Sequence, residues 1–85
     1  MMKTVFLYST AGCHLCDTAW EILAPLITQL PLRLEEVDIA ETDELIERYG
    51  IRIPVLKFEN ESEELGWPFD AQQAWAFLQS HLDIR

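Results

Sequence analysis

The stretch Cys13-His14-Leu15-Cys16 lies between a short apolar run at residues 4–8 and an amphipathic segment that begins at Asp17. Two thiols separated by two residues, at the junction of an expected strand and an expected helix, can form and break a disulfide bond within one motif. The spacing therefore predicts that these two cysteines are the reactive residues of the chain. The other residues are expected to position the pair and to adjust its reactivity.

The composition predicts one ordered domain over residues 1–85, with an acidic surface and a monomeric state. Hydrophobic residues make up 49%, and 15 acids against 6 bases give a formal net charge of -9. This charge argues against nucleic acid and anionic membrane surfaces as partners, because both attract Lys and Arg. No apolar run suits a signal peptide or a membrane span, so we expect a cytoplasmic protein. In that compartment a cysteine pair is more often catalytic or metal-binding than structural.

The hydrophobic pattern predicts the order strand, helix, strand, helix, strand, strand, helix. Period-two and apolar runs favour strands, whereas helical spacing of apolar residues follows the cysteines and Asp70. The first crossover helix makes the first two strands parallel neighbours, and the short turn near Asn60 makes the last two antiparallel. The strands are expected at residues 3–9, 34–38, 54–58 and 63–66, and the helices at residues 14–30, 43–49 and 71–82.

Several residues have structural roles in this arrangement. Thr42 and Asp70 are expected N-caps, with Gln73 completing a capping box, and Gly50 suits the C′ position of the second helix. Pro25 is expected to kink or break the first helix. The side chains expected to pack inside are Leu15, Ala19, Trp20, Ile22, Leu23, Leu26, Ile27, Leu30, Leu45, Ile46, Tyr49, Ala71, Ala74, Trp75, Phe77, Leu78 and Leu82. His81 is expected at the surface or as a cation at the end of the last helix.

A Cys-x-x-Cys after the first strand, with Pro54 opening a later strand, resembles the thioredoxin fold in its short glutaredoxin-like form. Residues 9–17 are similar to those of small bacterial glutaredoxin-like proteins, and residues 49–54 to the thioredoxin segment that carries a cis-proline. The resemblance covers nearly the whole chain. It implies an α/β fold of the order βαβαββα, with a four-stranded mixed sheet and three helices, and a cis peptide bond between Ile53 and Pro54.

The cysteine pair is expected to act as a thiol–disulfide oxidoreductase on protein or small-molecule disulfides. If a helix starts at Cys13, unpaired backbone N–H groups and the positive end of the dipole favour its thiolate and lower its pKa. A protonated His14 would add to this effect, and Asp17 would oppose it. We therefore predict Cys13 as the exposed nucleophile and Cys16 as the buried resolving thiol. The alternative of two inert core cysteines stays open.

A substrate groove is expected around the pair. The resemblance implies that the Ile53 backbone pairs with an extended substrate, and the apolar loop at residues 67–69 could shape the groove. The substrate-binding residues are predicted to be His14, Leu15, Arg52, Ile53, Pro54, Gly66, Trp67 and Asp70.

The sequence departs from glutaredoxins where they bind glutathione. No lysine precedes Cys13, and Trp67 stands where glutaredoxins usually have a second glycine. Arg52 could supply a replacement cation, and Asp70 is equally well explained as an N-cap. The first strand also lacks the buried acid of thioredoxins. Glutathione and thioredoxin reductase are therefore both retained as candidate reductants, with no bound cofactor expected.

Two alternatives to an enzyme stay open. One is a metal-binding or iron–sulfur module, although a structural zinc site needs four ligands and this chain offers two cysteines, His14 and the distant His81. We therefore assign no metal ligands. The other is a redox-inactive binding module that has kept the fold.

Overall fold

The computed structural model describes residues 3–82, which form a four-stranded mixed sheet, three α-helices and one short 3-10 helix. In the order β2-β1-β3-β4, β1 is parallel to β2 and antiparallel to β3, and β3 is antiparallel to β4. The predicted α/β thioredoxin fold is thus confirmed. The elements are β1 (Lys3–Ser9), α1 (His14–Ile27), β2 (Leu32–Asp38), η1 (Ile39–Glu41), α2 (Asp43–Tyr49), β3 (Val55–Phe58), β4 (Glu64–Gly66) and α3 (Ala71–Ser80).

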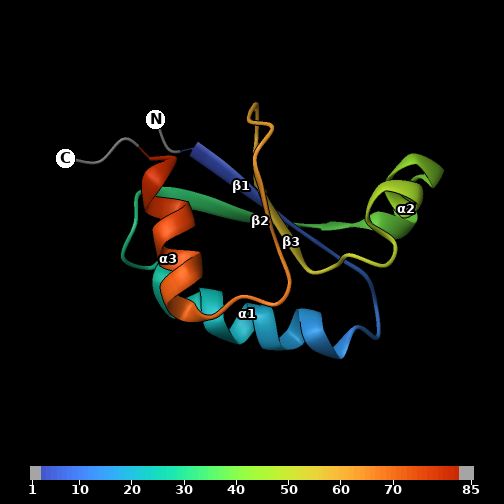
Figure 1. The fold of residues 1–85 in the computed structure, drawn as a ribbon, viewed down its shortest axis with the longest axis horizontal. Helices are drawn as coiled ribbons and strands as arrows, with labels where there is room; N and C mark the ends of the chain where they lie inside the picture. Colours follow the sequence, from blue (N-terminus) through green and yellow to red (C-terminus); the bar gives the residue numbers. More distant parts are fainter. Residues whose placement is uncertain (1–2, 83–85) are drawn as a thin grey trace.

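The central strand β1 is apolar on both faces because each face meets a separate core. Val5 and Leu7 pack into the larger core, which also contains residues of α1 and α3. The alternate residues Phe6 and Tyr8 pack into a smaller core with Tyr49 of α2. Figure 1 shows α1 and α3 together and α2 apart from them. Side chains that alternate along one strand therefore hold the two helical layers in place.

The strand β2 is longer than the predicted span of residues 34–38, because it begins at Leu32, opposite Lys3 of β1. Leu32 and Leu34 pack against the larger core, whereas Val37 packs against the smaller one. The slip in the apolar pattern is therefore a change of buried face along one continuous strand. The alternation slips because Glu36, a charged residue, follows Leu34 on the same face of the strand.

The helix α1 ends at Ile27, earlier than the predicted Leu30. It continues through Pro25 for two residues, so the expected break does not occur there. The carbonyl of Pro25 accepts hydrogen bonds from the side chains of Thr28 and Gln29 at 2.8 and 3.0 Å. These polar side chains satisfy a carbonyl at the helix end that has no intrahelical partner.

The helix α2 is capped by Thr42 as predicted, since the threonine hydroxyl accepts a hydrogen bond from the Leu45 N–H. Ile46 was expected to be buried, but it is 46% exposed because only one face of this short helix meets the sheet. Gly50 is the C-cap of α2, one residue before the expected C′ position, and its φ is -50°. A Cβ at Gly50 would lie 2.5 Å from the Ile46 carbonyl oxygen, so close approach explains the glycine.

The helix α3 begins with the predicted capping box between Asp70 and Gln73. His81 lies at the end of α3 as its C-cap, one of its two expected positions, and its side chain is 9% exposed rather than at the surface. Its ring stacks on Phe58 at 5.2 Å between centroids, and its Nε2 lies 2.9 Å from Glu63 Oε1. Two other packing predictions were wrong, since Ala71 and Trp20 are exposed. None of the helices within residues 3–82 is long and apolar enough to cross a membrane.

Candidate functional site

The two cysteines lie at the start of α1, where Cys13 is the N-cap. Gly12 turns the chain into the helix with a φ of 79°, a conformation that favours glycine. The Cys13 sulfur accepts a hydrogen bond from the Cys16 N–H at 3.1 Å and is joined to the Cys16 sulfur in a disulfide. Cys16 is 4% exposed, whereas Cys13 is partly exposed. The geometry thus distinguishes an accessible sulfur from a covered one.

The two residues between the cysteines face outward. His14 is exposed, and Leu15, expected to pack inside the helix layer, is 49% exposed. The larger core reaches α1 through Ala19 and Leu23 instead. An imidazole and an apolar side chain therefore stand at the surface directly beside the disulfide.

The segment before β3 reaches the same edge of the sheet as the cysteine loop. Tyr8 pairs with Val55, so Pro54 lies just beyond the carboxyl end of β1. The Ile53–Pro54 peptide bond is cis, and Pro54 is buried. The Ile53 N–H donates to the Tyr49 carbonyl at 3.1 Å, whereas the Ile53 carbonyl accepts no backbone hydrogen bond from any of residues 3–82. That carbonyl is the group that could pair with an extended substrate.

The end of β4 brings Gly66 and Trp67 next to the Pro54 segment, since Gly66 pairs with Val55. The Trp67 N–H donates to the Pro54 carbonyl at 3.1 Å, and the indole packs on the larger core and edge-on against Phe69. Gly66 is exposed, and no atom lies within 4 Å of a Cβ built on it. The Trp67–Pro68 bond is also cis, a feature that was not predicted from the sequence. Asp70 is occupied as an N-cap, since its carboxylate accepts from the Gln73 N–H at 2.8 Å.

Arg52 is engaged within the chain by Glu64. Its Nη2 donates to Glu64 Oε1 at 2.7 Å, and the Tyr49 hydroxyl donates to Glu64 Oε2 at 2.5 Å. The Tyr49 ring stacks on Tyr8 at 4.3 Å between centroids, and the Arg52 guanidinium lies 5.4 Å from the centre of the Tyr49 ring. The charge that Arg52 would offer to a glutathione carboxylate is therefore already paired.

Burial and hydrogen bonding shift the pKa values within this network. Burial alone would raise the pKa of Glu64, but hydrogen bonds from Tyr49 and Arg52 and the charges of Arg52 and Arg48 hold it below its ordinary value. Burial, followed by the hydrogen bond to the Glu64 carboxylate, raises the pKa of Tyr49. Burial also raises the pKa of Tyr8. The network thus favours a carboxylate that is ionised and tyrosines that are neutral.

Because the pKa of Glu64 is lower in the folded chain, its ionised form contributes stability above the unfolded value of 4.5. That contribution is lost as the pH falls through the folded pKa. We expect the free energy of unfolding, measured by urea titration between about pH 3 and pH 6, to fall more steeply for the wild type than for Glu64→Gln. Glu61→Gln, which changes an exposed turn residue, is the matched control and should keep the wild-type slope.

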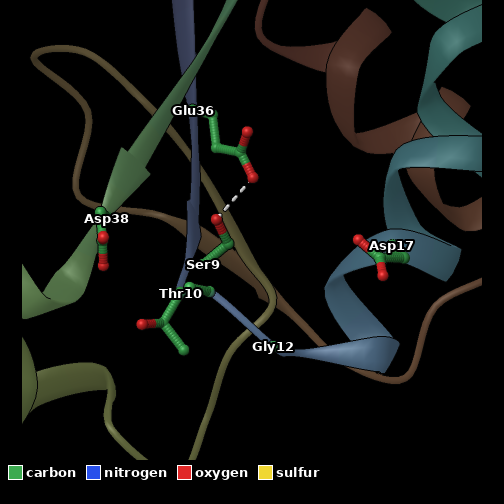
Figure 2. Close-up of a pocket in the computed structure, with 7 residues that line it drawn as sticks. Ser9, Thr10, Gly12, Asp17, Glu36 and Asp38 are labelled. Carbon is green, nitrogen blue, oxygen red and sulfur yellow. Dashed lines mark hydrogen bonds between the residues drawn. The ribbon is translucent and has the colours of Figure 1, made fainter.

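A pocket of about 390 Å³ lies beside the cysteine motif and was not predicted. Figure 2 shows Glu36 and Asp17 directed into the space between the sheet and α1, with Asp38 on the other side of Ser9. The buried Ser9 hydroxyl donates to Glu36 Oε2 at 2.7 Å. The lining residues are Ser9, Thr10, Ala11, Gly12, Asp17, Glu36 and Asp38.

The carboxylates at residues 35–47 have the sequence pattern of a solvated surface, so this pocket was not predicted. The signal that could have revealed it is the predicted parallel pairing of the first two strands. Parallel strands end at the same edge, so Glu36 and Asp38 had to lie beside the loop that carries Cys13. Within residues 3–82, no three His, Cys, Asp or Glu side chains gather closely enough to hold a metal ion.

Comparison with known structures gives the same fold. The X-ray structure of the structural-genomics target protein XcR50 from X. campestris is 38% identical, covers 89% of this chain and 96% of its own, and superposes with a TM-score of 0.75. Protein Ne2328 from Nitrosomonas europaea is 29% identical, with 91% and 92% covered and a TM-score of 0.74. A mutant thioredoxin from Halobacterium salinarum, 18% identical with a TM-score of 0.77, covers 98% of this chain and 77% of its own and shares the fold.

No curated protein matches this chain. Residues 4–79 do match the family described as the glutaredoxin-like domain, DUF836. This match spans nearly the whole folded part, including the cysteine motif, the Ile53–Pro54 segment and most of α3. The chain therefore belongs to the glutaredoxin-like domain family.

Proposed function

We propose that this protein is a thiol–disulfide oxidoreductase in which Cys13 is the attacking thiolate and Cys16 the resolving thiol. The observation that carries the proposal is the Cys13–Cys16 disulfide at the start of α1, with Cys13 partly exposed and Cys16 covered. A substrate disulfide can reach only a sulfur that is accessible to solvent, and attack requires a thiolate. The Cys16 N–H that points at the Cys13 sulfur would also stabilise its negative charge after reduction.

The reaction proceeds by two exchanges. The Cys13 thiolate attacks one sulfur of the substrate disulfide, which releases the other sulfur as a thiolate and leaves a mixed disulfide. The Cys16 thiolate then attacks the Cys13 sulfur and releases the second substrate thiol. The substrate gains two electrons and the protein loses two, leaving the Cys13–Cys16 disulfide. An external dithiol or two external thiols must then reduce the protein.

We place this reaction in the cytoplasm, with one domain over residues 1–85 and a protein or small-molecule disulfide as substrate. His14 and Leu15 would border the substrate, and the Ile53 carbonyl would pair with its backbone. Gly66 has no side chain, so the backbone next to it is accessible to a substrate, and Trp67 would line one side of the substrate groove. The pairing of Arg52 with Glu64 weakens the case for glutathione as the reductant, and thioredoxin reductase is the other candidate.

Coupled turnover assays test this proposal. Wild type, Cys13→Ser and Cys16→Ser would each be assayed with glutathione and glutathione reductase, and separately with thioredoxin reductase. We expect wild-type turnover with at least one system and none with Cys13→Ser. If the wild type turns over with neither system, the enzyme proposal is wrong. A reversible Cys13–Cys16 bond without turnover would then favour a redox sensor or a binding module.

A further inference from the structure

The acidic pocket lies beside the cysteine motif, and its lining includes residues next to both cysteines in the sequence. Ala11 and Gly12, which line it, immediately precede Cys13, and Asp17, which also lines it, immediately follows Cys16. The pocket residues therefore bracket the motif on both sides.

All the charged side chains that line the pocket are negative. Three exposed carboxylates, those of Asp17, Glu36 and Asp38, line it, and none of its lining residues is basic. The chain as a whole carries a formal net charge of -9, which adds to the same field. An anionic substrate such as oxidised glutathione would be repelled here, whereas a cationic side chain would be attracted.

Apolar side chains are exposed within the cysteine motif and shortly before the cis-proline. Leu15 is 49% exposed, and Ile51, which lies two residues before Ile53, is fully exposed. Exposed apolar side chains of this size at a reactive edge are suited to contact with a polypeptide. Together with the free Ile53 carbonyl, these side chains form a surface that can bind an extended peptide backbone. The acidic pocket beside it can bind one basic side chain of that peptide.

We infer, building on the proposed function, that the substrate is a protein disulfide with a Lys or Arg beside the attacked cysteine. The basic side chain enters the pocket at Glu36 and Asp38 while Cys13 attacks the neighbouring sulfur. The redox step is the two-electron exchange described above. Charge complementarity thus selects the substrate, and it disfavours glutathione.

Single-turnover kinetics with model peptides test the inference. Each peptide carries one cysteine in a mixed disulfide with thiopyridine and has Lys, Gln or Glu as the next residue. The prereduced protein attacks the peptide sulfur, and the released thiopyridone is followed by absorbance. We expect the Lys peptide to react about tenfold faster than the Glu peptide at low ionic strength, with the Gln peptide between them. The ratio should shrink in about 0.5 M salt because exposed charges are then screened.

Variants that each remove one carboxylate charge test whether the pocket causes the preference for the Lys peptide. Glu36→Gln and Asp38→Asn keep oxygen acceptors for the Ser9 hydroxyl and the Ala40 N–H. Each is expected to lower the Lys-to-Glu rate ratio about threefold. Glu47→Gln removes the same charge from an exposed position on α2 that does not line the pocket, and should leave the ratio unchanged.

The outcomes separate this inference from the proposed function. Equal wild-type rates for the Lys and Glu peptides would overturn the charge selection and leave the oxidoreductase intact. An equal loss of the ratio in Glu47→Gln would show that net charge, and not the pocket, selects the substrate. If no peptide and no other disulfide reacts with the wild type, both proposals fail.

Discussion

Cys16→Ser is expected to trap its substrate as a stable mixed disulfide. In this variant the Cys13 thiolate still attacks, but serine cannot displace the bound thiol, because its hydroxyl stays protonated at neutral pH. After reaction with the Lys peptide, nearly all of the protein should carry one peptide on Cys13, visible as a mass increase that a reductant removes. The wild type should instead release the peptide and end as the intramolecular disulfide, because the two Cα atoms lie only 5.2 Å apart.

Cys13→Ser is the control, since it retains one thiol at the same motif. We expect no adduct with this variant under the same conditions, because the Cys16 sulfur is covered and cannot be approached in line by a peptide disulfide. An adduct that forms on Cys16 in Cys13→Ser, but not on Cys13 in Cys16→Ser, would reverse the assigned roles. Adducts of equal yield in both variants would show that burial does not distinguish the two sulfurs.

The topology of the sheet follows from local patterns in the sequence. A continuous apolar run, a helical period and two antiparallel segments around Asn60 are local signals, and together they predict the order and pairing of the strands. Caps such as Thr42 and Asp70 are likewise local, because a capping side chain bonds to a backbone N–H within three residues. These features were therefore predictable from the residues themselves.

Features that depend on contact between two distant segments were not predictable from the sequence. The burial of His81 requires Phe58 and Glu63 to meet the end of α3, and no local pattern indicates that stacking. The network of Tyr49, Glu64 and Arg52 joins α2 to β4 across the sheet edge in the same way. In the sequence, Glu64 is one of several acids in a polar stretch, so its special environment has no local signature.

The candidate site was predictable in part. The cysteine pair and the Pro54 segment could be identified from spacing and resemblance, and the fold brings both to the same edge of the sheet. The acidic pocket beside them was missed because a carboxylate on a strand is usually solvated, and the pairing of Glu36 with a buried hydroxyl depends on the register of β1 and β2. Register, unlike topology, is set by packing over the whole strand.

Leu23→Ala is expected to destabilise the fold more than any surface change discussed above. Leu23 is fully buried in the larger core, where α1 packs against β1 and α3. Removing a buried leucine side chain beyond its Cβ costs about 3 to 5 kcal/mol, because the transfer free energy is lost and a cavity remains. Small domains are stable by only about 5 to 15 kcal/mol, so the melting temperature should fall by more than about 10 °C.

Leu15→Ala makes the same chemical change on the same helix and is the matched control. Because Leu15 is half exposed beside the disulfide, its truncation should cost less than about 1 kcal/mol of folding free energy, as measured by thermal and urea unfolding. It should instead lower the single-turnover rate with the Lys peptide, since the apolar contact would be made only with a substrate. A large loss of stability in Leu15→Ala would mean that this side chain serves the fold, and the apolar part of the proposed substrate surface would then have to be withdrawn. Opposite responses of the two variants, one in stability and the other in rate, would assign the inner face of α1 to folding and its exposed start to recognition.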